Sequence, residues 1–148
     1  MFDYFANPTR FSKIARLILP WLEIISVACL GYGLYLALLS SPADYQQGDA
    51  VRIMYIHVPA AWIALSSYLL LGICAFFFLI WRHPLAEIAA RSIAPIGTGF
   101  AVITLITGSL WGKPIWGVWW VWDGRLTSML ILFFFFMGYL ALSNLSLI

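Results

Sequence analysis

Four long apolar stretches limit the folds that are open to this chain. They cover residues 17–39, 58–81, 93–110 and 126–148, and only short segments separate them. A helix needs roughly 20 apolar residues to cross a hydrocarbon layer about 30 Å thick. Because lipid offers the backbone no hydrogen bonds, segments that cross it form helices. We therefore predict an all-α fold, a polytopic transmembrane helical bundle of four spans that forms one membrane domain over residues 1–148.

The composition agrees with a membrane protein and argues against other classes. The chain is 64% hydrophobic and 9% charged, and its mean hydropathy is +0.95. A formal charge of +2 without a basic run argues against nucleic-acid binding. Cys29 and Cys74 stand alone inside spans, without a CxxC motif, and are predicted to be packing residues. The glycines of the third span, among them Gly97 and Gly108, predict close helix packing.

The positive charges predict how the spans are oriented in the membrane. Lys and Arg accumulate on the cytoplasmic side of a membrane protein. Five of them lie in the N-terminal segment and in the turn after the second span, and three lie in the other two loops. The first group is Arg10, Lys13, Arg16, Arg82 and Arg91, and the second is Arg52, Lys113 and Arg125. We therefore expect a cytoplasmic N-terminus, with the loops after spans one and three outside.

The segment after the third span holds five of the eight tryptophans of the chain. This Trp-rich loop, residues 111–125, contains Trp111, Trp116, Trp119, Trp120 and Trp122. One or two tryptophans commonly anchor a span at the bilayer surface, because the ring is apolar and its N–H is polar. Five exceed what anchoring needs, and they predict a surface that holds a flat aromatic ligand.

Two backbone conformations are open to this loop. In a short helix over residues 116–123, Trp116, Trp119, Trp120 and Asp123 would share one face, at 100° per residue. Trp111 and Trp122 would then lie on the opposite side, toward lipid. Gly112, Pro114 and Gly117 favour an irregular backbone instead. Asp123 suits either a ligand-related role, such as orienting a Trp N–H, or the N-cap of the fourth span.

His57 lies at the start of the second span, on the same predicted side as the Trp-rich loop. Pro59 suits the first turn of a helix and biases Val58 toward an extended conformation. We therefore expect His57 just before the helix begins, where the positive end of the helix dipole disfavours the imidazolium form. A neutral imidazole is the form that binds metals. His83, on the predicted inner side, is expected to be a solvated turn residue.

Two motifs resemble a known family. The sequence WGVWWVWDGRLT is similar to the WWD motif of bacterial heme-handling membrane proteins of cytochrome c maturation. The sequence IMYIHVPAAW resembles the segment with the first external histidine in the heme exporter protein C (CcmC) type of that family. The resemblance runs from the N-terminus to the last residue. It implies a protein of the bacterial cytoplasmic (inner) membrane that binds b-type heme non-covalently and transiently.

The resemblance also implies a role for each matching residue. His57 is implied as an axial ligand of the heme iron. The resemblance implies that Trp116, Trp119, Trp120 and Trp122 hold the macrocycle and that Arg52 and Arg125 pair with the propionates. Asp123 is implied to belong to the same heme site. Lys113 is a weaker candidate for a propionate, with a snorkelling role favoured.

The implied partners belong to a larger assembly. They are a periplasmic heme chaperone (CcmE), the ABC transporter subunits CcmA and CcmB, the small single-span protein CcmD, and membrane lipid. The chain has no nucleotide-binding loop, so we expect any ATP hydrolysis to occur in a partner. The family pattern has six spans and a second external histidine, so we expect this sequence to be a truncated form.

Two other functions compete with heme handling. A structural subunit of a transporter complex would use the Trp-rich loop only to anchor itself and to dock a neighbour. An enzyme is the second alternative, because larger members of the same superfamily ligate heme to apocytochrome. The chain has no further histidine within its spans for a second heme, so we expect a protein that is not an enzyme.

Overall fold

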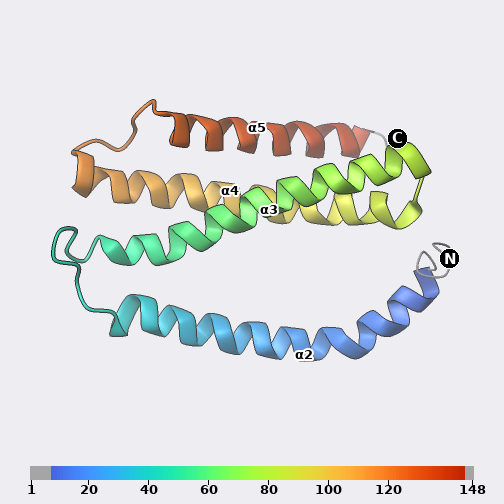
Figure 1. The fold of residues 1–148 in the computed structure, drawn as a ribbon, viewed down its shortest axis with the longest axis horizontal. Helices are drawn as coiled ribbons and strands as arrows, with labels where there is room; N and C mark the ends of the chain where they lie inside the picture. The colour runs from blue at the N-terminus through green and yellow to red at the C-terminus, as the bar shows by residue number, and fades with distance from the viewer. Residues whose placement is uncertain (1–7, 146–148) are drawn as a thin grey trace.

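The computed structural model describes residues 8–145, which form four long helices (Figure 1). Helix α2 covers Pro8–Tyr35 and continues into a π-helical turn, η1, at Leu36–Ser40. Helices α3, α4 and α5 cover Val51–Trp81, Pro84–Trp116 and Gly124–Leu145. No strand occurs among these residues, which confirms the all-α prediction. All four helices are long and apolar enough to cross a membrane, as a multi-pass membrane protein requires.

The helices extend beyond the apolar stretches that predicted them. Helix α3 begins seven residues before residue 58, and α4 continues six residues past residue 110. Apolar residues mark where a chain meets lipid, whereas helical hydrogen bonds continue into the interface until a cap ends them. Two positive-φ residues provide those ends, Arg82 after α3 (φ 51°) and Gly117 after α4 (φ 77°).

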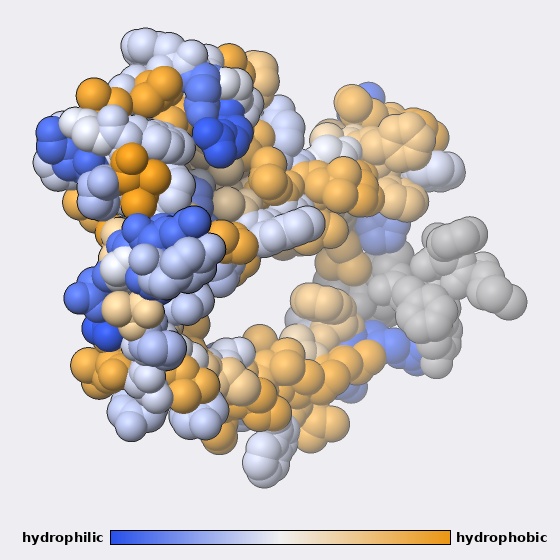
Figure 2. Space-filling view, turned by 60° about the vertical axis from the view of Figure 1, so that its left-hand side comes forward, coloured by the Kyte–Doolittle hydropathy of each residue, from blue (hydrophilic) through white to orange (hydrophobic). Residues whose placement is uncertain are grey.

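Helices α3, α4 and α5 pack together, whereas α2 lies apart from them (Figure 1). None of the residues in the most apolar part of α2 is buried. A groove of about 800 Å³ separates α2 from α3 and α4, and Figure 2 shows an open gap between them. Its walls include Ser26 and Gly33 from α2, Ile63 from α3 and Phe100 from α4.

Small residues allow α3 and α4 to approach closely. Ala64 of α3 and Ala101 of α4 are fully buried, and they form a cluster with Phe136 of α5. Phe136 fits over Gly97, where an added Cβ would lie 2.3 Å from the Phe136 Cζ atom. Between apolar helices in lipid, such close van der Waals contact is a main source of association. The predicted role of Gly97 in close packing is confirmed.

Polar contacts hold the end of the bundle where α4 begins and α5 ends. Arg91 of α4 donates hydrogen bonds to the Glu87 carboxylate (3.0 and 3.2 Å) and to the Ser143 carbonyl of α5 (3.1 Å). His83 occupies the N-cap position of α4 at this end, without a hydrogen bond from its side chain to the helix. Because the Trp-rich loop follows the other end of α4, His83 lies far from it, as expected.

The Gly97–Phe136 contact generates a test of the packing. The Gly97→Ala variant places a methyl group against Phe136, and overpacking of this kind costs roughly 1–3 kcal/mol. We expect a lower midpoint of denaturant-induced unfolding in detergent micelles. Gly99→Ala in the same helix is the matched control, because its Cβ meets no atom within 4 Å. Equal midpoints for the two variants would contradict this account of the packing.

Candidate functional site

One cavity lies where the start of α3, the end of α4 and the start of α5 meet. Its volume is about 590 Å³, within the roughly 300–1,000 Å³ of small-molecule sites. Its lining is mostly apolar. We call it the Trp–His cavity, lined by Met54, His57, Ala61, Leu65, Thr104, Leu105, Gly108, Trp111, Trp116, Arg125, Leu126, Ser128, Met129 and Leu132.

His57 lies in the second turn of α3, so the prediction that it precedes the helix is wrong. Helix α3 begins at Val51 and includes Pro59. A proline inside a helix removes one backbone hydrogen bond, but membrane helices tolerate this where neighbouring helices pack around the site. The dipole argument for a neutral imidazole also fails, because that effect is confined to the first turn.

Helix α4 instead provides the contacts of His57. The Nδ1 atom lies 3.0 Å from the Thr107 hydroxyl oxygen. The next residue, Gly108, leaves room for the ring, since a Cβ there would lie 3.1 Å from the His57 Cε1 atom. The imidazole is therefore held against α4 while it lines the Trp–His cavity.

The Trp-rich loop has an irregular backbone, and the short helix over residues 116–123 does not form. Helix α4 continues through Pro114 to Trp116, and residues 117–123 are not helical. Gly117 ends the helix in the left-handed conformation, which glycine adopts at little cost. Lys113 supports this end by donating a hydrogen bond to the Gly117 carbonyl (2.9 Å).

The tryptophans form two groups. Trp111 and Trp116 line the Trp–His cavity and meet edge to face, with ring centroids 5.1 Å apart. Trp111 also donates its N–H to the Gln47 side chain (2.9 Å). The predicted lipid-facing position of Trp111 is therefore wrong. It depended on a helix that does not form.

The second group lies outside the cavity lining. Trp120 and Trp122 meet edge to face, with centroids 5.5 Å apart, and the Lys113 ammonium lies 5.8 Å from the Trp119 ring centroid. The Trp120 N–H is buried and has no hydrogen-bond partner among the described residues. A buried donor of this kind is costly to leave unpaired.

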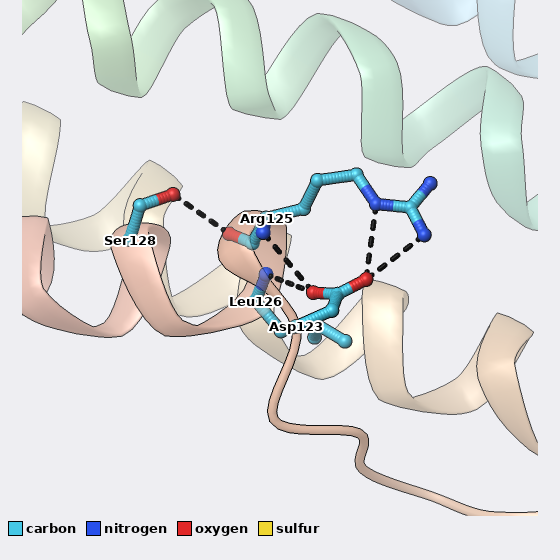
Figure 3. A network of polar contacts seen from close by, with 4 residues as sticks. All are labelled: Asp123, Arg125, Leu126 and Ser128. Carbon is cyan, nitrogen blue, oxygen red and sulfur yellow. Dashed lines mark hydrogen bonds and ion pairs between the residues drawn. The ribbon is translucent and has the colours of Figure 1, made fainter.

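Asp123 is the N-cap of α5, as one of its two predicted roles required. Its Oδ1 atom accepts hydrogen bonds from the backbone N–H groups of Arg125 (3.1 Å) and Leu126 (2.9 Å). Its Oδ2 atom accepts two from the Arg125 guanidinium, at 3.1 and 2.9 Å (Figure 3). The Leu126 N–H, followed by the Arg125 side chain, lowers the pKa of Asp123.

The two predicted propionate partners lie in different surroundings. Arg125 lines the Trp–His cavity, with its guanidinium carbon 5.4 Å from the Trp116 ring centroid, and its side chain is 79% exposed. Arg52 does not line the cavity. It donates hydrogen bonds to the carbonyls of Leu38 and Ser41, both at 3.0 Å, and pairs with Asp49 at 3.4 Å. The guanidinium of Arg52 thus ties η1 to α3.

Comparisons with known proteins agree with the resemblance drawn from the motifs. The family model for heme exporter protein C matches residues 1–146. The chain belongs to the heme exporter protein C family. Similar members include the heme exporter protein C of Bradyrhizobium diazoefficiens, 51% identical over 93% of this chain and 52% of that relative. Those of Paracoccus denitrificans and Escherichia coli K12 are 46% and 47% identical over 93% of this chain. They are covered over 57% and 56% of their own lengths, so the chain spans little more than half of these relatives.

Sequence reasoning missed part of the cavity of this family member. Gly108, which lines the cavity, and Thr107, which contacts His57, were not among the predicted site residues, and Trp111 was predicted only as one of the loop tryptophans. Yet Thr104, Gly108 and Trp111 follow one another at helical spacing. Extending the third helix to residue 111 would have placed Trp111 on the same face as Thr104 and Gly108. No comparable pattern points to Met129, which comes to the cavity from α5.

The cap of α5 generates a prediction about pH. The folded state lowers the pKa of Asp123, so the cap stabilises the protein fully above the ordinary Asp pKa of about 3.9. This stability is lost as the pH falls through the lower, folded-state value. We expect the difference in unfolding midpoint between the native protein and Asp123→Asn to be larger at neutral pH than at pH about 3. Asparagine also caps helices but does not titrate. A difference that is independent of pH would contradict the assignment.

Proposed function

We propose that this protein binds heme at the outer face of the bacterial cytoplasmic membrane and presents it to a periplasmic heme chaperone during cytochrome c maturation. One observation supports this most. His57, two tryptophans and Arg125 converge on a single apolar cavity, although His57 is far from the others in sequence. The relatives are named heme exporter protein C, which agrees with heme as the cargo.

The side chains of the cavity fit the chemistry of heme. The cargo is a flat apolar macrocycle with an iron at its centre and two carboxylates at one edge. An imidazole is a common iron ligand, and indole rings stack on porphyrin. An arginine pairs with carboxylates through parallel hydrogen bonds. The Trp–His cavity offers each of these groups beside an apolar wall.

In this proposal, His57 supplies one bond to iron, and Trp116 supports the macrocycle together with Trp111. Arg125 pairs with a propionate. The exposed guanidinium of Arg125 can release the Asp123 carboxylate and bind a propionate while it stays against the Trp116 ring. Asp123 then acts chiefly by holding the start of α5 and the position of Arg125.

The predicted site residues outside the cavity have smaller roles in this proposal. Trp119, Trp120 and Trp122 extend the aromatic surface beyond the cavity, and the unpartnered Trp120 N–H is a donor for a heme oxygen. Arg52 could reach the second propionate only by giving up the carbonyls of Leu38 and Ser41. We therefore rank Arg125 before Arg52 as a propionate partner.

The orientation and the assembly complete the proposal. The end of the bundle with Arg82 and Arg91 faces the cytoplasm by the distribution of positive charge, so the Trp–His cavity faces outward. The proposed partners are the chaperone CcmE, the transporter subunits CcmA and CcmB, and the small protein CcmD. The protein binds and releases b-type heme without chemical change, so it is not an enzyme. In this proposal the cargo is held non-covalently and transiently.

A second function, as a docking subunit without its own heme site, is favoured by one observation. The apolar surface of helix α2 is exposed, and a groove of about 800 Å³ separates α2 from α3 and α4. This surface is available for packing against another helix. The two functions exclude each other, and they predict different effects of substitutions in the Trp-rich loop.

Substitution of the histidine tests the first function. Detergent-purified His57→Ala is expected to lose most of the Soret absorbance that the native protein acquires with added heme, because the iron loses its imidazole. His83→Ala is the matched control at the opposite end of α4. A Soret band that is equal in the native protein and in His57→Ala would contradict the ligand assignment.

Substitution of two tryptophans separates the two functions. Replacing Trp119 and Trp120 together with leucine removes two rings of the aromatic surface beyond the cavity but keeps apolar side chains. Heme binding predicts a weaker Soret band with unchanged recovery of the transporter subunits during affinity purification. A docking role predicts the reverse, namely lost recovery of those subunits and an unchanged heme content.

A further inference from the structure

The ring of His57 is held on one side by two consecutive residues of α4. Thr107 contacts the Nδ1 atom at 3.0 Å, and the absence of a side chain at Gly108 lets the Cε1 atom approach the helix. Both residues lie on the face of α4 that borders the Trp–His cavity, since Thr104, Gly108 and Trp111 line it. The imidazole therefore has a defined position before any cargo is bound.

The hydrogen bonds of Thr107 favour one of the two neutral tautomers of His57. A threonine hydroxyl has one hydrogen to donate and lone pairs that accept. The Thr107 Oγ1 atom lies 2.7 Å from the Ile103 carbonyl and 3.3 Å from the Thr104 carbonyl, and carbonyls can only accept. The single hydroxyl hydrogen is therefore directed to the backbone. The Thr107 oxygen is then left to accept from His57, which favours the ring proton on Nδ1 and a free lone pair on Nε2.

We propose that Thr107 and Gly108 are positioning residues that hold His57 in the Nδ1–H tautomer and direct its Nε2 atom to the cargo. This inference rests on the proposed heme-binding function. Neither residue touches the iron. Thr107 acts through the tautomer, and Gly108 acts by leaving space for the ring. Hydrogen bonds to the second nitrogen of a ligating histidine also raise its basicity, and losing them typically weakens metal binding about 10–100-fold.

The first measurement needs no heme. The chain has two histidines, so the His83→Gln background leaves one imidazole for ¹⁵N NMR. In the heme-free protein we expect the Nδ1–H tautomer. Thr107→Val keeps the shape of the side chain but removes the acceptor, and it is expected to shift the population toward Nε2–H. Thr107→Ser retains the hydroxyl and is expected to restore Nδ1–H.

The second measurement is heme titration of the same variants in detergent. Thr107→Val is expected to weaken heme binding by about 10–100-fold and to change the visible spectrum, with recovery in Thr107→Ser. Gly108→Ala displaces the ring and is expected to weaken binding as well. Thr98→Val is the matched control, because Thr98 also donates to a backbone carbonyl of α4, that of Ala94 at 2.8 Å, away from His57.

The two measurements separate this inference from the proposed function. If His57→Ala lowers heme affinity but Thr107→Val changes neither affinity nor tautomer, the positioning role is overturned. If His57→Ala and Thr107→Val both leave affinity unchanged, the heme-iron assignment fails together with the inference. A loss of affinity in Thr98→Val equal to that in Thr107→Val would show a general effect of threonine removal. That result would also overturn the positioning role of Thr107.

Discussion

Helices α3 and α4 lie so close together that side chains from one reach the backbone of the other. Ala64 and Ala101 are buried at this contact, and Phe136 from α5 covers the gap left by Gly97. The same close approach continues to the end of the pair, where His57 meets Thr107 and Gly108. A larger residue at Gly108 would press on the imidazole, since a Cβ there would lie 3.1 Å from the His57 Cε1 atom, and it would displace the ring from Thr107. The geometry of the Trp–His cavity therefore depends on the packing of small residues along the whole length of the pair.

The end of α4 divides the tryptophans of the Trp-rich loop into two groups. Gly117 stops the helix in a left-handed conformation, and Asp123 starts the next one by capping its N-terminus. Between these points the backbone is irregular, so Trp119, Trp120 and Trp122 do not share one face of a helix with Trp116. Trp111 and Trp116, still on the helix, line the cavity, whereas Trp119, Trp120 and Trp122 lie beyond it. The resulting surface is divided between a pocket wall and an exposed rim.

Helix α2 is joined to the other helices by polar contacts at its end and not by close packing along its length. Its apolar surface is largely uncovered, and its connection to the bundle is polar, through the bonds of Arg52 to the carbonyls of Leu38 and Ser41. These carbonyls lie at the C-terminal end of α2 and η1, where helical partners are missing, so a guanidinium stabilises them well. An arginine that the family resemblance associates with the cargo thus has a structural task at the end of a helix.

The sequence by itself determined the class of fold, the number of spans and the family, because hydropathy and two local motifs carry that information. It also gave the N-cap as one of two roles for Asp123, because a cap depends only on neighbouring residues. The start of α3 before His57, the position of Trp111 and the surroundings of Arg52 were decided by the tertiary structure. Each depends on contacts between segments far apart in the chain, such as His57 with Thr107 and Trp111 with Gln47. Local propensity places a proline at a helix start and a tryptophan toward lipid, but packing between helices can outweigh both preferences.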